Sequence, residues 1–177
     1  MNAPVGNFWS TQYDAEFQRC VSKRLPYGYD WLRIKAQGCE ESGLNTQAVS
    51  PKGAIGVMQW MPADWLEWRD KCGYGSQITP QMAAPNIDCA CAYMNYLIGQ
   101  WRAPRPDFDR WRLALASYNT GIGNVLDAQK LAGGVSDYAS IIPRLVDVTG
   151  DSNANQTTEY VDRITRIYAT LILPEAA

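Results

Sequence analysis

Glu41 is the residue in this chain best placed to do acid chemistry. It stands at the end of an apolar helical stretch, and a largely uncharged segment punctuated by glycines follows at residues 50–62. Such a segment cannot easily continue a helix and is typical of a cleft wall. A carboxyl group against such a wall loses hydration, and because desolvation disfavours the charged form, we expect the pKa of Glu41 to be raised. A protonated carboxyl group in a groove suits the cleavage of glycosidic bonds.

The composition excludes several other chemistries. The chain has no histidine. It therefore lacks the residue that serine–histidine and cysteine–histidine nucleophile systems and imidazole zinc sites require. Cys89 and Cys91 are two residues apart and would point away from each other on a helix, which argues against a shared metal ion. The net charge is -2 with no basic block, so no nucleic-acid partner is expected. We expect neither a metal nor any other cofactor.

The cysteine count leaves the redox state open. Five cysteines are an odd number, so at least one must stay unpaired within a monomer. Buried thiols are favoured for most of them, and one or two disulfides are the alternative.

Helices must position these groups, because apolar residues recur at helical spacing and strand-type alternation is scarce. Caps, prolines and glycines set the predicted boundaries. Helices are predicted over residues 14–24, 30–41, 62–72, 86–101, 108–118, from 123 or 124 to 131, and 157–173, with a partly helical stretch at 137–146 interrupted by a proline. Loops are predicted at residues 44–59, 133–134 and 149–156. The fold class is therefore mainly α, with a small hairpin or an irregular loop after Glu41.

The predicted helix at residues 30–41 separates two neighbouring acids. Asp30 can cap its start. Glu41 continues an apolar line through Ile34 and Gly38, whereas Glu40 continues a polar line, so Glu41 is the better candidate for a partly buried acid.

Length and composition favour one domain over residues 1–177. The chain is 46% hydrophobic and can bury a sizeable core. Residues 1–6 lack the basic and apolar regions of a signal peptide, and no apolar run reaches 18 residues, so no export signal or membrane span is expected. A substrate outside the cytoplasm would need another delivery route.

Four segments together resemble a known family. In order and spacing, they are similar to the motifs of lytic transglycosylases with a lysozyme-like fold, the SLT type, over about residues 31–168. The segments are Glu41-Ser42-Gly43-Leu44-Asn45, the run from Ser50 to Pro62, Ala116-Ser117-Tyr118-Asn119-Thr120-Gly121 and Gln156-Thr157-Thr158-Glu159-Tyr160-Val161. Mild departures are Val57, Ser117, Thr120 and Gln156, and they concern substrate fit more than chemistry.

The resemblance implies an activity and a set of site residues. It implies cleavage of the β-1,4 bond between N-acetylmuramic acid and N-acetylglucosamine in peptidoglycan, without water as acceptor. Glu41 takes the place of the general acid and base. The substrate-binding positions fall on Ser50, Gln59, Met61, Tyr118, Asn119 and Tyr160.

The chemistry can proceed with one carboxyl group. Most glycosidases use two, but an N-acetyl oxygen of the substrate can support the developing oxocarbenium ion instead. Glu41 would protonate the leaving oxygen and then take the proton of the muramyl C6 hydroxyl, which closes onto C1 as a 1,6-anhydro ring. Met58, Met61 and Tyr160 could supply the apolar surroundings that raise the pKa of this acid.

Structural roles compete with the functional ones. A tyrosine at a helix end usually packs, and Asn119-Thr120-Gly121 is a common way to end a helix. The face of a tryptophan ring can stack on a sugar ring. Core packing nevertheless explains Trp65 and Trp111 better, and Trp60 is left unassigned.

Two alternative functions stay open from sequence. One is a muramidase resembling goose-type lysozyme, in which water completes the reaction. The other is a noncatalytic structural or glycan-binding protein with the same fold. A wall-cutting domain without an export signal also suggests a bacteriophage product, carried in the virion or released at lysis, that acts on the cell wall in the periplasm and could have virion or tail partners.

Overall fold

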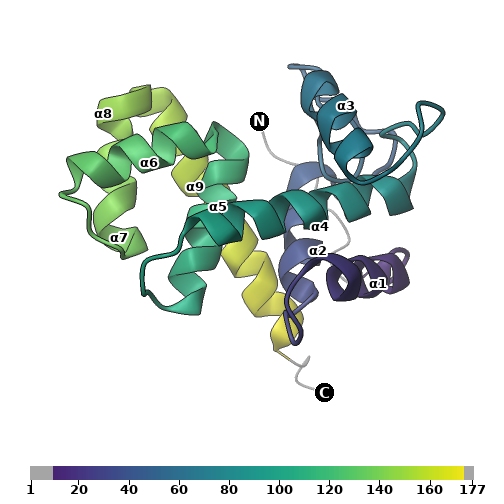
Figure 1. Cartoon of the computed structure of the whole chain (residues 1–177), viewed down its shortest axis with the longest axis horizontal. Coiled ribbons are helices and arrows are strands. Elements are labelled where there is room, and N and C mark those ends of the chain that lie inside the picture. The colour runs from purple at the N-terminus through teal and green to yellow at the C-terminus, as the bar shows by residue number, and fades with distance from the viewer. Residues whose placement is uncertain (1–9, 174–177) are drawn as a thin grey trace. The chain divides into compact units, whose positions relative to one another are not determined.

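The chain is represented by a computed structural model that describes residues 10–173. Over this range the regular elements are helices, which confirms the mainly α class (Figure 1). Two compact units are formed: unit 1 contains residues 10–93 and 164–173, and unit 2 contains residues 94–163. The expectation of a single domain stays a prediction.

Unit 1 holds the predicted acid. Its helices are α1 (Asp14–Arg24), α2 (Leu32–Ser42), α3 (Pro62–Lys71), residues 83–93 of α4 (Ala83–Gln100) and residues 164–172 of α9 (Asp151–Ile172). The bounds of α1 are those predicted, because acids in its first turn and bases in its last turn both suit the helix dipole. Phe17, Cys20 and Val21 form its buried face.

Polar contacts fix α2, the helix that carries Glu41. The N-cap position of α2 is Trp31, one residue after the predicted Asp30. Asp30 still satisfies the first helical N–H: its Oδ1 accepts a hydrogen bond from the Leu32 backbone N–H at 3.0 Å, and its Oδ2 accepts one from the Tyr168 hydroxyl at 2.8 Å. Lys35, which is buried, forms a 2.7 Å ion pair with Asp14 of α1. A buried ammonium group needs such a partner, so α2 is held against α1 and the end of α9.

An irregular loop connects α2 to α3. Two isolated β-bridges, Val49 with Ile55 and Ile55 with Trp60, are formed there, without a named strand in the described range. Of the two predicted forms for this segment, the irregular loop is correct.

Unit 2 is a cluster of shorter helices. Besides residues 94–100 of α4 and 151–163 of α9, it comprises α5 (Asp107–Thr120), α6 (Ile122–Leu131), α7 (Tyr138–Ile141), the 3-10 turn η1 (Ile142–Leu145) and α8 (Val146–Thr149). In Figure 1, α6, α7 and α8 form one green group. Pro143 lies in η1, where the predicted interruption falls. The core includes Trp101, Trp111, Leu113, Leu115, Ile141 and Leu145.

Two helices, α4 and α9, begin three or more residues before their predicted starts. The loop predicted at residues 149–156 is instead the first turns of α9, which begins at Asp151 directly after Gly150 at φ 78°. Its polar sequence hides the helix, although Ala154 is buried. Helix α4 begins at Ala83 rather than residue 86, because Pro85 occupies the first turn, where its missing N–H costs nothing.

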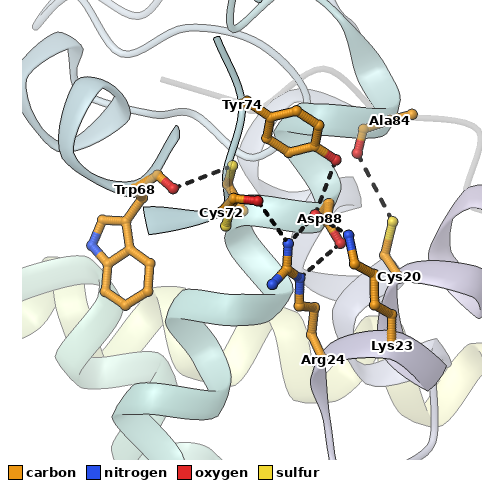
Figure 2. Close-up of polar contacts among 9 residues, drawn as sticks. Cys20, Lys23, Arg24, Trp68, Cys72, Tyr74, Ala84 and Asp88 are labelled. Atoms are coloured by element: carbon orange, nitrogen blue, oxygen red, sulfur yellow. Dashed lines mark hydrogen bonds and ion pairs between the residues drawn. The ribbon is translucent and has the colours of Figure 1, made fainter. Parts of the chain in front are cut away.

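A buried carboxylate joins α1 to α4. Asp88, whose side chain is 0% exposed, accepts hydrogen bonds from Arg24 Nε and Lys23 Nζ and from the Tyr74 hydroxyl, each at 3.0 Å (Figure 2). Burial alone would raise the pKa of Asp88, but these three donors outweigh it and lower that pKa.

Acid should therefore weaken the fold through Asp88. Because its pKa is lower in the folded chain than in the unfolded one, its contribution is complete above about pH 4 and is lost as the pH falls through the folded value. We expect Asp88→Asn to reduce the free energy of unfolding by about 3 kcal/mol at pH 7 and by less at pH 3. Urea unfolding across this pH range measures the difference.

The matched control is Asp127→Asn, which removes an exposed ion pair with Lys130 and should cost under about 1 kcal/mol. If the Asp88→Asn and parent stabilities stay equally far apart from pH 7 to pH 3, this account of Asp88 is wrong.

Candidate active site

Glu41 lies in the last turn of α2 and is half-buried. The apolar line that it continues is buried, with Ile34 at 0% exposure. At Gly38 a Cβ would stand 3.1 Å from the Met58 sulfur, so the glycine lets Met58 pack closely on α2. Glu40 is half-buried too, so exposure does not distinguish the two acids. They differ in the face of α2 on which they lie. The catalytic role of Glu41 stays a prediction.

The residue after Glu41 connects α2 to the following loop. Ser42 Oγ donates a hydrogen bond to the Val57 carbonyl at 2.8 Å and accepts one from the Asn45 N–H at 3.0 Å. Gly43 ends the helix in the left-handed conformation. Ser42 was not among the predicted site residues. Its one mark in the sequence is a hydroxyl side chain between Glu41 and Gly43, the glycine that ends the helix.

Asn86, in the first turns of α4, organises the loop. It is 0% exposed, and its Oδ1 accepts a 2.9 Å hydrogen bond from the Met58 N–H. Its Nδ2 donates to the carbonyls of Pro80 at 2.7 Å and Ile55 at 3.4 Å. Its backbone carbonyl accepts from Trp60 Nε1 at 3.1 Å. One side chain thus satisfies backbone groups of two loop segments, a role that sequence reasoning also missed.

Three of the tryptophans considered for sugar stacking, Trp60, Trp65 and Trp111, are buried. Trp60 is 3% exposed and packs edge-on against Trp65, with ring centroids 6.1 Å apart. Trp65 and Trp111 are buried, which confirms their predicted place in the core. The unassigned Trp60 therefore belongs to the core of unit 1.

The predicted loop residues divide by exposure. Met61 is 41% exposed at the start of α3. Gln59 is half-buried at φ 49°, and its Nε2 donates to the Gly56 carbonyl at 2.9 Å and the Ala48 carbonyl at 3.3 Å. Ser50 Oγ accepts from the Ala54 N–H at 3.0 Å. Gln59 and Ser50 thus shape the loop, and Met61 presents its side chain at the surface.

The other three predicted residues lie in unit 2. Tyr118 is half-buried in the last turn of α5, and Asn119 follows it with an exposed side chain. The Thr157 hydroxyl of α9 donates a 2.9 Å hydrogen bond to Asn119 Oδ1. Tyr160, 4% exposed, stands three residues after Thr157 and so on the same face of α9. This bond joins two of the sequence motifs within unit 2, and Thr157 was not among the predicted residues.

Solved structures of similar fold align with about nine tenths of this chain. The 70 kDa soluble lytic transglycosylase of Escherichia coli aligns over 90% of this chain and 24% of its own, with a TM-score of 0.70 and 21% identity. An inactive mutant of the lytic transglycosylase Slt of Pseudomonas aeruginosa aligns over 91% of this chain and 24% of its own, with a TM-score of 0.68 and 25% identity. The expected lysozyme-like fold is confirmed.

The sequence comparisons define the family. The model of the transglycosylase SLT domain matches residues 25–141, and this chain belongs to that family. Similar curated proteins include the membrane-bound lytic murein transglycosylases F of Shewanella pealeana, 30% identical over 91% of this chain, and Shewanella halifaxensis, 31% identical over 88%. The chain spans 34% and 36% of their respective lengths, about a third of the curated relatives it matches.

Two loop glycines give a matched test of this geometry. Both Gly53 and Gly56 have positive φ, but a Cβ at Gly56 would collide with the Pro80 carbonyl and the Asn86 amide, whereas one at Gly53 meets no atom within 4 Å. We expect Gly53→Ala to cost about 1–2 kcal/mol of stability from backbone strain alone and Gly56→Ala at least about twice that. Thermal or urea unfolding measures both, and equal losses would contradict the packing described for Gly56.

Proposed function

We propose that this chain carries a peptidoglycan lytic transglycosylase domain. It cleaves the β-1,4 bond between N-acetylmuramic acid and N-acetylglucosamine and leaves 1,6-anhydro-muramyl ends. The observation that carries the proposal is the family match over residues 25–141, with Glu41 half-buried at the end of α2 within the matched range. The names of the relatives, lytic murein transglycosylases, support this activity.

Glu41 serves as general acid and then as general base. Its carboxyl proton goes to the leaving glycosidic oxygen, while the N-acetyl oxygen of the substrate supports the positive charge at C1. The resulting carboxylate then takes the proton of the muramyl C6 hydroxyl, which attacks C1 to close the anhydro ring. The inactive Pseudomonas enzyme carries glutamine in place of one glutamate, which supports an essential role for a glutamate in this family.

The remaining predicted residues serve substrate binding, some by contact and two by shaping the loop. Met61 offers an exposed apolar surface for a sugar face. Asn119, with its Oδ1 engaged by Thr157, offers its Nδ2 hydrogens to a sugar or acetamido oxygen. Tyr118 and Tyr160 provide further contacts. Ser50 and Gln59 contribute by holding the loop in shape, since their polar groups bond to its backbone.

Peptidoglycan glycan strands are the proposed partner, and the bacterial cell wall is the proposed place of action. Among residues 10–173, no helix is both long and apolar enough to cross a membrane. Delivery in a phage virion, release at lysis and virion partners stay predictions, and the comparisons offer no support for them.

Replacing Glu41 tests the proposal. We expect Glu41→Gln to lower the rate of wall clearing by about a thousandfold, because the amide cannot donate and retrieve a proton. Glu40→Gln is the matched control, changing the neighbouring half-buried acid, and should retain most of the activity. Turbidity loss of purified cell walls measures the rates. Full activity in Glu41→Gln would remove this residue from the chemistry.

The products distinguish the alternatives. Mass spectrometry of digested muropeptides should show anhydro-muramyl ends. Reducing ends in their place would identify a hydrolase of the goose-type kind, and no cleavage by a folded parent protein would favour a noncatalytic role.

The hydrogen bond between Thr157 and Asn119 has its own test. Thr157→Val should free the Asn119 side chain, cost about 1 kcal/mol of stability and raise KM several-fold with kcat less affected. Thr158→Val is the control, because the hydroxyl of Thr158 donates within α9, to the Ala154 carbonyl at 2.9 Å. Equal KM values for the two variants would show that this bond does not position Asn119 for substrate.

A further inference from the structure

The end of α3 and the first turns of α4 bring two cysteines together in unit 1. Cys72 follows the last residue of α3, and its N–H donates to the Trp68 carbonyl at 2.9 Å. The Cys89 thiol donates to that same carbonyl, with the sulfur 3.7 Å from the oxygen. The sulfur of Cys89 therefore lies against the backbone turn that ends at Cys72.

A second contact holds these segments in register. Arg24 Nη2 donates to the Cys72 carbonyl at 3.4 Å and to Asp88 Oδ2 at 2.5 Å, and Asp88 directly precedes Cys89. Figure 2 shows this guanidinium group between the Cys72 carbonyl and the Asp88 carboxylate. Each of the two thiols also changes the pKa of the other, as neighbouring side chains do.

The two sulfurs differ in chemical character. Cys72 is half-buried, and a hydrogen bond that the Cys89 thiol can donate to the Cys72 thiolate lowers the pKa of Cys72, with Arg24 acting in the same direction. Cys89 is 0% exposed, and the same hydrogen bond together with burial raises the pKa of its thiol. The accessible sulfur is thus the better nucleophile, and the hidden one is placed to attack second.

We propose that Cys72 and Cys89 are a redox-active dithiol that a small-molecule or protein disulfide oxidises to a disulfide bond joining the end of α3 to α4. The inference does not depend on the proposed catalytic function.

The reaction balances as a thiol–disulfide exchange. The Cys72 thiolate attacks one sulfur of the oxidant, forms a mixed disulfide and releases the first oxidant thiolate. The Cys89 sulfur then attacks Cys72 and expels the second oxidant thiolate, and the two protons lost from the cysteines end on the two thiols released. The dithiol is oxidised by two electrons and the oxidant disulfide is reduced by two.

The other cysteines are poor competitors. Cys20, Cys39 and Cys91 are buried. Burial raises the pKa of Cys20 and of Cys39 to about 11, and raises that of Cys91 as well, so these thiols stay protonated near neutral pH.

The disulfide between Cys72 and Cys89 would close a loop of residues 72–89, a segment that includes Pro80 and Asn86. It should raise the Tm by about 5–10 °C.

The test uses the folded full chain with oxidised glutathione, followed by an acid quench and alkylation of the remaining thiols. Cys91→Ala serves as the background, because Asp-N cleavage before Asp70, Asp88 and Asp107 then leaves one cysteine each in peptides 70–87 and 88–106. We expect these two peptides to be joined by a disulfide, with a higher Tm that falls back on reduction. Cys72→Ser and Cys89→Ala should each abolish the linked pair, and Cys20→Ala should retain it.

Circular dichroism confirms that each variant is folded before oxidation. Complete alkylation of all thiols after oxidation, a stable glutathione adduct on Cys72, or a link between any other pair would overturn the proposal.

Discussion

The buried amide of Asn86 is the interaction on which the rest of unit 1 depends. The loop between α2 and α3 makes its own backbone hydrogen bonds in short turns and two isolated bridges, without an extended ladder. The buried Met58 N–H bonds to Asn86 instead. A backbone group that is buried without a partner costs about 1–3 kcal/mol. Asn86 supplies an acceptor to Met58 and donors to the carbonyls of Pro80 and Ile55, all from one side chain at 0% exposure.

This arrangement has a consequence for the acid. With the loop fixed on α4, the Val57 carbonyl is held where Ser42 donates to it, and Ser42 is the neighbour of Glu41. Met58 packs against Gly38 on the same helix. In the proposed mechanism Glu41 donates one proton and then accepts another, and this needs a fixed position, since small displacements are costly in catalysis. The loop between α2 and α3 and the end of α2 therefore fix the position of Glu41 together.

Local features were predictable and distant ones were not. The bounds of α1 follow from its charges and apolar stripe, and the hydrogen bond that Asp30 accepts at the start of α2 follows from its position before that helix. The start of α9 at Asp151 was missed, because a polar first turn looks like a loop.

At the site, residue types at fixed spacing led to Glu41 and to the family that the match confirms. Asn86 is about thirty residues from the loop it holds, and Thr157 is 38 residues from Asn119. No local pattern encodes such pairings, since they arise only when the helices pack.

Hydrogen exchange at the Met58 amide tests this account most directly. In the native protein this N–H donates to a buried side chain at 2.9 Å, so it should exchange at least about a thousandfold more slowly than the amide of Lys52 at the exposed turn of the same loop. Equally rapid exchange at both amides would mean that Asn86 does not hold the loop, and the proposed basis for placing Glu41 would be wrong.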